Sequence, residues 1–143
     1  MFYHEKELHA VSDQVLYATS DGSKGTKGKV EDVIREMLEK GAVIDRAFFM
    51  GCTQMLERCS ETTRPYGVPT VVALNSIMLD GTGMCGACRL SVGGKTRFAC
   101  VDGPEFDGHT VDWEELHQRK SAYAEQEVVA YQSYSHECMA ERS

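Results

Sequence analysis

Four side chains that can bind metal lie close together between positions 80 and 100. Cys85 and Cys88 form a C-x2-C pair, Cys100 follows after eleven residues, and Asp80 stands at the head of an Asp-x4-Cys spacing. Plant-type [2Fe–2S] sites use C-x4-C-x2-C and a distant fourth cysteine. The same spacing occurs here with aspartate in the first place, and three thiolates with one carboxylate carry the usual four negative charges. The pattern predicts an iron–sulfur electron carrier with an unusual oxygen ligand.

Glycines are interspersed among these four residues, at Gly81, Gly83 and Gly86. A loop that wraps a cluster needs close backbone approach and positive φ angles, which glycine adopts at little cost. Backbone N–H groups exposed by such a loop can donate to the cluster sulfurs and tune the reduction potential.

A β-hairpin is predicted after the C-x2-C pair, with strands over Arg89–Val92 and Thr96–Cys100. A two-residue turn would place Cys88 and Cys100 on opposite faces of the hairpin, because side chains alternate along a strand. A three-residue turn over Gly93–Lys95 pairs the two cysteines directly, so we predict that turn, although two-residue loops are commoner.

Other interpretations of the cysteines are open. The three cysteines with His109 could form a Cys3His zinc site, and the C-x2-C pair could be a redox-active dithiol. Asp80 could simply turn the chain, because Asp-Gly is a common turn dipeptide. Cys52, Cys59 or Cys138 would then be substitute fourth ligands. From the residues alone we favour a cluster over zinc.

Composition narrows the class of protein. The chain has 143 residues, of which 42% are hydrophobic and 26% charged, with a formal net charge of −7. The negative charge and the lack of a basic stripe disfavour nucleic acid and anionic membranes as partners. No apolar run is long enough to span a membrane and no signal peptide opens the chain, so a cytoplasmic location is expected. Six cysteines, half of them in one short segment, suggest metal ligands in a reducing compartment.

The first half of the chain predicts an α/β fold with β-α-β-α-β order over residues 15–74. Apolar runs predict the strands and helical spacing predicts the helices, with Gly41 as a stop signal. We expect a three-stranded parallel sheet with right-handed crossovers, its last strand buried on both faces. The predicted elements are strands Val15–Thr19, Ala47–Met50 and Pro69–Leu74, and helices Val30–Leu38 and Thr53–Thr63.

Two segments could contact a nucleotide in such a fold. The glycine-rich loop Ser20–Lys29 could hold a phosphate with its amides, and Gly51–Met55 follows a parallel strand, where open sheets bind ligands. Without further information, the loop is best interpreted as a flexible surface turn and Met55 as a core residue. The basic residues Lys24, Lys27 and Lys29 are expected to form a solvated rim.

The organisation therefore has three parts: a nucleotide-domain segment over 1–74, a cluster module over 75–112, and a C-terminal helix and tail over 113–143. Asp112 with Glu115 predicts a capping box that opens this last helix. Beyond Tyr123 the helix is only weakly amphipathic, and fraying is expected over the last dozen residues.

Three blocks together resemble a known family: Thr19–Val30, Phe48–Met55 and residues 78–112. They are similar to the ferredoxin–NADP reductase-like small subunits of electron-bifurcating NADH-dependent ferredoxin:NADP oxidoreductases, also called sulfide dehydrogenase subunits. The dihydroorotate dehydrogenase electron-transfer subunit is a nearby relative that uses cysteine where this chain has Asp80. The resemblance covers about residues 5–120, is most specific over Asp80–Asp112, and favours a cluster over zinc.

The resemblance implies roles for individual residues. The cluster ligands are Asp80, Cys85, Cys88 and Cys100, and the nucleotide side carries Asp21, Gly22, Ser23, Gly51 and Met55. The family's nucleotide motif usually reads C-G-P-x-x-M. Here Met50 and Cys52 stand at the cysteine and proline places, whereas Gly51 and Met55 match the motif.

The resemblance also implies a larger parent protein. Family members carry an FAD-binding barrel, a pyridine-nucleotide domain and a C-terminal [2Fe–2S] module, and this chain begins late in the second of these. It is therefore expected to be a C-terminal fragment or split product of a subunit that passes electrons between NAD(P)H, FAD and the cluster. Its expected partners are a larger flavin and iron–sulfur subunit and the missing FAD domain, the latter through an exposed apolar edge. No acid, base or nucleophile is proposed here, and the alternative is a zinc-stabilised interaction module without redox activity.

Overall fold

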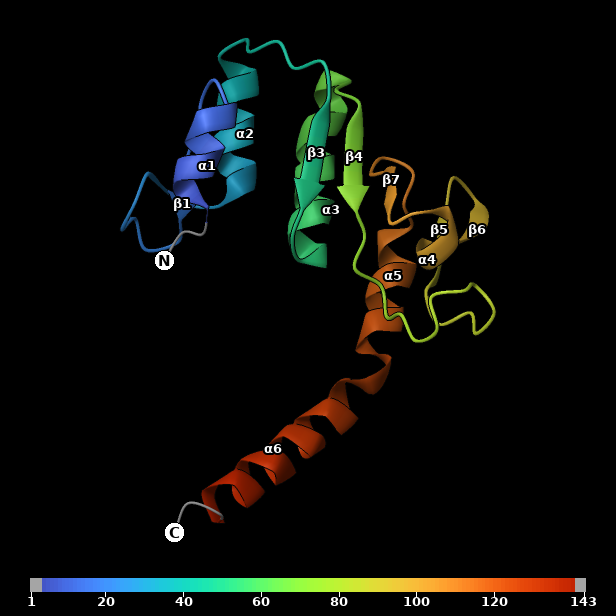
Figure 1. Cartoon of the computed structure of the whole chain (residues 1–143). Coiled ribbons are helices and arrows are strands. Elements are labelled where there is room, and N and C mark those ends of the chain that lie inside the picture. Colours follow the sequence, from blue (N-terminus) through green and yellow to red (C-terminus); the bar gives the residue numbers. More distant parts are fainter. Residues whose placement is uncertain (1–3, 141–143) are drawn as a thin grey trace.

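The computed structural model describes the backbone of residues 4–140 and the side chains of residues 4–134. Figure 1 shows the elements in chain order from the N-terminal helix to the long C-terminal helix. The elements are α1 (Glu5–Val11), β1 (Ala18–Thr19), β2 (Thr26–Lys27), α2 (Val30–Glu39), β3 (Ala47–Met50), α3 (Thr53–Thr63), η1 (Arg64–Tyr66), β4 (Thr70–Ala73), β5 (Arg89–Val92), β6 (Lys95–Phe98), α4 (Ala99–Asp102), β7 (Glu105–Asp107), α5 (Trp113–Lys120), η2 (Ser121–Tyr123) and α6 (Ala124–Ala140).

A three-stranded sheet lies at the centre, in the order β3-β4-β7. β3 and β4 are parallel and are joined through α3, as the sequence predicts, and the bounds of β3 and α3 are confirmed. The third strand differs from the prediction, because β7 pairs with β4 in the antiparallel direction. The chain passes through the cluster loop and the hairpin between β4 and β7. The strand that pairs with the second edge of β4 therefore comes from the C-terminal part of the chain.

The predicted strand Val15–Thr19 is wrong in length and in pairing. Only Ala18 and Thr19 are extended, and they pair in parallel with β2 in a separate two-stranded ribbon. The backbone of this segment bonds to the glycine-rich loop that follows it, since the N–H of Thr26 donates to the Tyr17 carbonyl at 2.8 Å. Because these backbone hydrogen-bonding groups are satisfied within the loop, the segment does not add a strand to the central sheet.

The glycine-rich loop is also better anchored than a flexible turn with a solvated rim. The Lys24 ammonium pairs with the Glu5 carboxylate and lies 4.0 Å from the centre of the Tyr17 ring. The Thr19 hydroxyl donates to the Lys24 carbonyl at 3.0 Å. Helix α1 and the loop therefore hold each other, and Lys24 is paired with Glu5 while its side chain stays 37% exposed.

The predicted hairpin forms, but with the two-residue turn. Arg89 pairs with Phe98 and Val92 with Lys95, so that only two glycines connect the strands. The predicted three-residue turn and the direct pairing of Cys88 with Cys100 are therefore wrong. Gly93 and Gly94 both adopt positive φ, 58° and 72°, as a tight hairpin turn requires.

One hydrophobic core joins the three predicted parts of the chain. Leu56 from α3, Val72 from β4, Leu90 from the hairpin and Leu116 from α5 are each at most 1% exposed and belong to one cluster of buried side chains. β4 buries one face fully and the other only partly, contrary to the expectation for this strand. The cluster module is therefore fixed to the sheet by shared packing.

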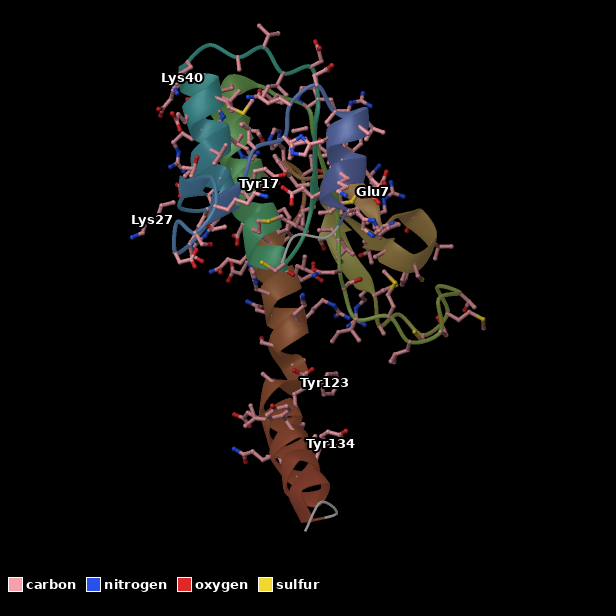
Figure 2. The ribbon with its side chains drawn as sticks, turned by 60° about the vertical axis from the view of Figure 1, so that its left-hand side comes forward. Glu7, Tyr17, Lys27, Lys40, Tyr123 and Tyr134 are labelled. Carbon is pink, nitrogen blue, oxygen red and sulfur yellow. The ribbon has the colours of Figure 1, made fainter. Side chains whose placement is uncertain are left out.

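The C-terminal region begins with a capped helix and then leaves the core. The Asp112 carboxylate accepts the N–H of Glu115 at 2.9 Å and caps α5, but the predicted capping box does not form, because the N–H of Asp112 donates to the Ser91 carbonyl. Figures 1 and 2 both show α6 projecting away from the rest of the chain, and its side chains Val128, Val129, Tyr131 and Tyr134 are more than half exposed. The predicted fraying over the last residues lies largely outside the described side chains. Within residues 4–140 no helix combines the length and the apolar character needed to cross a bilayer.

Candidate iron–sulfur site

Cys88 and Cys100 come together despite the hairpin register. Their Sγ atoms lie 3.2 Å apart. The chain leaves β6 at Phe98 and turns into α4, so Cys100 is carried by a helical turn around the end of the hairpin to the side of Cys88. The predicted meeting of the two cysteines is confirmed, although it arises from α4 and not from strand pairing.

Backbone amides favour a thiolate at Cys88. Burial raises the pKa of this thiol, but the N–H groups of Cys100 and Ala99 point at it and the net pKa lies below its usual value. The pKa of Cys100 is raised, first by its hydrogen bond with Cys88 and then by burial. Of the two thiols, Cys88 therefore loses its proton more readily, and the thiolate is the form that binds metal.

The cluster loop, residues 80–88, has the backbone that the glycines predicted. Gly81, Gly83 and Gly86 adopt φ of 75°, 80° and 68°. The Ala87 N–H donates to Cys85 Sγ at 3.5 Å, and Cys85 is exposed. A loop with such a conformation directs N–H groups toward sulfur, which is the environment expected at an iron–sulfur site.

Asp80 organises the same loop. One carboxylate oxygen accepts the N–H of Thr82 at 2.9 Å and the other accepts the N–H of Cys85 at 3.0 Å. These bonds, the Thr82 N–H above all, lower the pKa of Asp80, so its carboxylate is charged. The structure therefore shows the turn role of Asp80, and its role as the fourth ligand stays a prediction.

The four predicted ligands form two close pairs. Cys88 lies against Cys100, and Asp80 bonds to the backbone of Cys85. Among the described residues, no three His, Cys, Asp or Glu side chains converge as a metal site. The donor set of three thiols and a carboxylate nevertheless fits a [2Fe–2S] cluster, because all four lie on one loop or at its base.

Two of the alternative ligands, His109 and Cys59, are engaged elsewhere. His109 Nε2 contacts the Thr63 hydroxyl at 3.1 Å, and Cys52 is exposed at the start of α3. Cys59 is fully buried in the core, where burial raises its pKa to about 12. Cys138 lies outside the described side chains. The histidine of the Cys3His zinc hypothesis is therefore already used in packing β7 against α3.

The predicted nucleotide residues converge only in part. Asp21 and Met55 both line a cavity of about 620 Å³ between the glycine-rich loop and the start of α3. Gly51 lies against Met55, since a Cβ on this glycine would stand 2.4 Å from Met55 Cε. Ser23 donates its N–H to the Asp21 carboxylate at 3.0 Å, which lowers the pKa of Asp21. Gly22 and Ser23 do not line the cavity.

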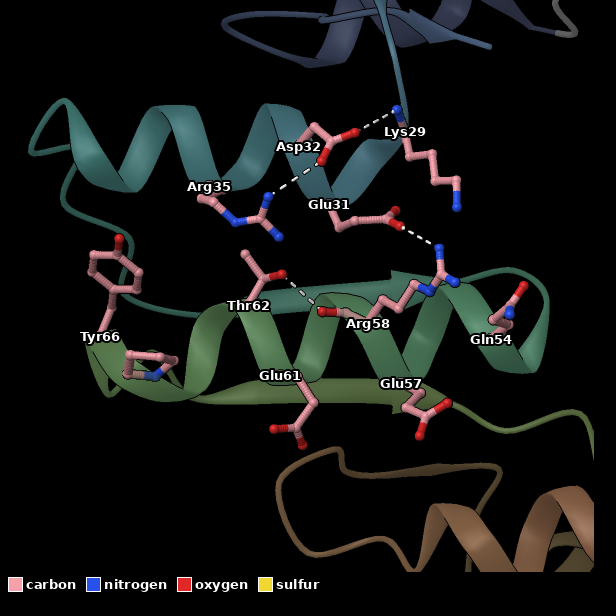
Figure 3. A pocket seen from close by; sticks show the side chains of 11 residues that line it. Lys29, Glu31, Asp32, Arg35, Gln54, Glu57, Arg58, Glu61, Thr62 and Tyr66 are labelled. Carbon is pink, nitrogen blue, oxygen red and sulfur yellow. Dashed lines mark hydrogen bonds and ion pairs between the residues drawn. The ribbon is translucent and has the colours of Figure 1, made fainter.

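A second cavity, which the sequence did not suggest, lies between α2 and α3 (Figure 3). It has a volume of about 850 Å³, and its walls are mostly charged. Glu31 is buried in it at 6% exposure and pairs with Arg58 at 3.4 Å. The charges on the facing helices compensate one another.

Two cations near the cluster loop were also missed. Arg119 and Lys120, at the end of α5, bond to Ala87 and Thr53, which are 32 and 67 residues away in the chain. No short-range pattern marks such contacts, because only the packing of α5 against the core creates them.

Comparison with known proteins gives a result that is consistent with an iron–sulfur site. Residues 75–112 match the family described as the iron–sulfur cluster binding domain of dihydroorotate dehydrogenase B. A Thermotoga maritima protein named dihydroorotate dehydrogenase B (NAD(+)), electron transfer subunit homolog is 48% identical over 128 residues, which are 90% of this chain and 45% of the relative. The electron transfer subunit of Geobacillus thermodenitrificans is 36% identical over 107 residues, 73% of this chain and 39% of the relative.

A solved structure gives the same result for the fold. It comes from work on flavin-based electron bifurcation by an NADH-dependent reduced ferredoxin-NADP oxidoreductase. It superposes with a TM-score of 0.80 at 45% identity, over 94% of this chain and 47% of that one. The chain spans about half the length of the curated relatives it matches.

Proposed function

We propose that this chain binds a [2Fe–2S] cluster and serves as an electron-transfer segment, because residues 75–112 match the family described as the iron–sulfur cluster binding domain of dihydroorotate dehydrogenase B. The observation that carries the proposal is the approach of Cys88 and Cys100 to 3.2 Å at the base of a glycine-rich loop. That loop already presents an N–H group to the third cysteine, Cys85.

The chain supplies ligands and a polar environment. Cys85, Cys88 and Cys100 are the thiolate ligands and Asp80 is the fourth. When bound, the cluster accepts and releases one electron at a time. The protein holds it at the surface of the module, with Cys85 exposed toward a partner and Cys88 on the buried side. No residue has to move a proton at carbon or oxygen.

Electrons are proposed to pass between NAD(P)H, FAD and the cluster in a larger assembly. The cavity lined by Asp21 and Met55 is the proposed remainder of a nucleotide site, and Gly22, Ser23 and Gly51 are proposed to shape it from the adjoining backbone. The relatives are about twice as long, which supports the proposal that an FAD-binding part and a larger partner subunit complete the assembly. We place this assembly in the cytoplasm, where thiol ligands stay reduced.

The exposed side of β3 supports docking of a missing half-domain. β3 is an edge strand of its sheet, and Phe48 and Met50 on it are 56% and 68% exposed. Apolar side chains on an open strand edge favour association with another chain. Light scattering of the isolated chain tests this, and a strictly monomeric species at high concentration would contradict it.

A zinc-stabilised module is the competing function. Anaerobic reconstitution with iron and sulfide, followed by a visible spectrum and analysis of iron, sulfide and zinc, separates the two. We expect a coloured protein with iron and sulfide in equal amounts. A colourless protein that takes up one zinc ion per chain instead would overturn the proposal.

A further inference from the structure

The backbone carbonyls of the two residues between Cys85 and Cys88 each accept a hydrogen bond from an arginine side chain. Arg89 donates from Nη1 to the Gly86 carbonyl at 3.3 Å, and Arg119 donates from Nη2 to the Ala87 carbonyl at 3.0 Å. With these carbonyls turned toward cations, the Ala87 N–H is free to donate to Cys85 Sγ. The arginines therefore help to set the orientation of the peptides in the C-x2-C segment.

The next residue of α5 holds a different part of the molecule. Lys120 donates from Nζ to Thr53 Oγ1 at 2.7 Å and to Asn75 Oδ1 at 3.2 Å. Thr53 also donates to Asn75 at 2.8 Å, and the Asn75 amide donates to the Gly51 carbonyl at 3.3 Å. This network lies where β3 and β4 end and α3 begins, at the carboxyl edge of the parallel strands.

The helix that carries both cations is fixed. Trp113 and Leu116 of α5 are 7% and 1% exposed and pack in the core. The Trp113 indole N–H donates to the Gly108 carbonyl at 3.2 Å. Arg119 and Lys120 thus extend from an anchored helix toward two sites that are far apart in the sequence.

We propose that the last turn of α5 is a tie between the cluster loop and the carboxyl edge of the sheet, with Arg119 and Lys120 as positioning residues. Arg119 fixes the C-x2-C peptides, and Lys120 fixes the strand ends at which a nucleotide is proposed to bind. The tie keeps the two redox sites at a constant separation. The electron-transfer role rests on the proposed function, whereas the mechanical role does not.

The tie also has an electrostatic consequence. A guanidinium beside the loop stabilises added negative charge, so it favours the reduced state of a bound cluster. Replacing Arg119 with glutamine should lower the midpoint potential. Arg119→Lys keeps the charge and should restore most of the potential, but it should restore the loop geometry less well, because lysine lacks the planar fork.

The first test uses the full chain without a cluster, under reducing conditions. The probe is the rate at which iodoacetamide labels Cys88, which is 2% exposed and so reports opening of the loop. A hydrogen bond from a charged donor contributes about 1.5–3 kcal/mol, so Arg119→Gln should speed labelling by about tenfold or more. The matched control is Arg97→Gln, which removes the same charge from β6 without touching the loop.

The second test addresses Lys120 by hydrogen exchange. Lys120→Met should speed exchange of the amides in the first turn of α3, whereas the control Lys95→Met at the start of β6 should not. Equal labelling of Cys88 in Arg119→Gln and Arg97→Gln, or unchanged exchange in Lys120→Met, would overturn the tie. Both measurements need no cluster, so they remain decisive even if reconstitution yields no [2Fe–2S] spectrum. In that case the proposed function fails and the tie is judged separately.

Discussion

Replacing Gly83 with alanine should weaken cluster binding far more than the same change at Gly81. Both glycines lie in the cluster loop with positive φ, 80° and 75°, where an L-residue costs about 1–2 kcal/mol. They differ in their surroundings. A Cβ at Gly83 would stand 2.6 Å from Val101 Cγ2, whereas a Cβ at Gly81 meets nothing within 4 Å. Overpacking of this kind adds about 1–3 kcal/mol.

The assay is the loss of visible absorption from the reconstituted protein in the presence of an iron chelator. Since about 1.4 kcal/mol is a factor of ten, Gly81→Ala should release the cluster about tenfold more readily and Gly83→Ala about a hundredfold. Adding Val101→Ala to Gly83→Ala removes the clash and should return the protein to the level of Gly81→Ala. Equal effects of the two single substitutions, or no rescue by Val101→Ala, would refute the described loop conformation.

Four further outcomes are expected. Asp80→Cys should keep a [2Fe–2S] spectrum with a shifted midpoint potential and greater resistance to mild acid, whereas Asp80→Ala should give a labile site; an unchanged spectrum, potential and acid stability in Asp80→Ala would leave Asp80 as a turn residue only. Because the pKa of Asp80 is lowered, its contribution to the stability of the cluster loop is complete above about pH 4 and is lost as the pH falls through the folded-state pKa. An acid titration that follows the order of the loop measures this loss. Leu116→Ala should lower the free energy of unfolding by about 2–5 kcal/mol in a urea titration. The control Leu79→Ala, at an exposed position, should change it by less than about 0.5 kcal/mol. A small effect of Leu116→Ala would contradict the anchoring of α5 in the core. The raised pKa of Cys59, about 12, means that the unfolded thiol ionises first, so stability is complete below about pH 8.5 and declines up to the folded-state value, by at most about 1.4 kcal/mol per pH unit; Cys59→Ala should remove this part of the decline in urea titrations from pH 8 to 11.

The central strands and helices could be predicted because local patterns determine them. Ala47–Met50 and Thr53–Thr63 have the predicted bounds, since apolar runs and helical spacing within each segment match the faces that they bury. The strand over Val15–Thr19 was overpredicted, because its apolar residues gave no sign that its backbone would bond to its own glycine-rich loop. β7 was missed because its pairing with β4 depends on the return of the chain through the whole cluster module.

The candidate site shows the same division. Spacing alone singled out Cys85, Cys88 and Cys100 as candidate ligands, and Cys88 and Cys100 do meet, although the hairpin register from which their meeting was predicted is wrong. The register argument failed because it treated the segment up to Cys100 as one strand, although the helical turn α4 begins at Ala99. The contacts of Arg119 and Lys120 could not be inferred, since they follow from how α5 packs on a core assembled from distant segments.

The most direct test of the account is the spectrum and metal content of two reconstituted cysteine variants beside the unaltered chain. Cys88 Sγ lies 3.2 Å from Cys100 Sγ at the proposed cluster site, whereas Cys138 belongs to the last turn of α6. We predict that Cys88→Ser abolishes the visible absorption and the equimolar iron and sulfide, and that Cys138→Ser leaves both unchanged. An intact [2Fe–2S] spectrum in Cys88→Ser, or its loss in Cys138→Ser, would contradict the assignment of this loop as the cluster site.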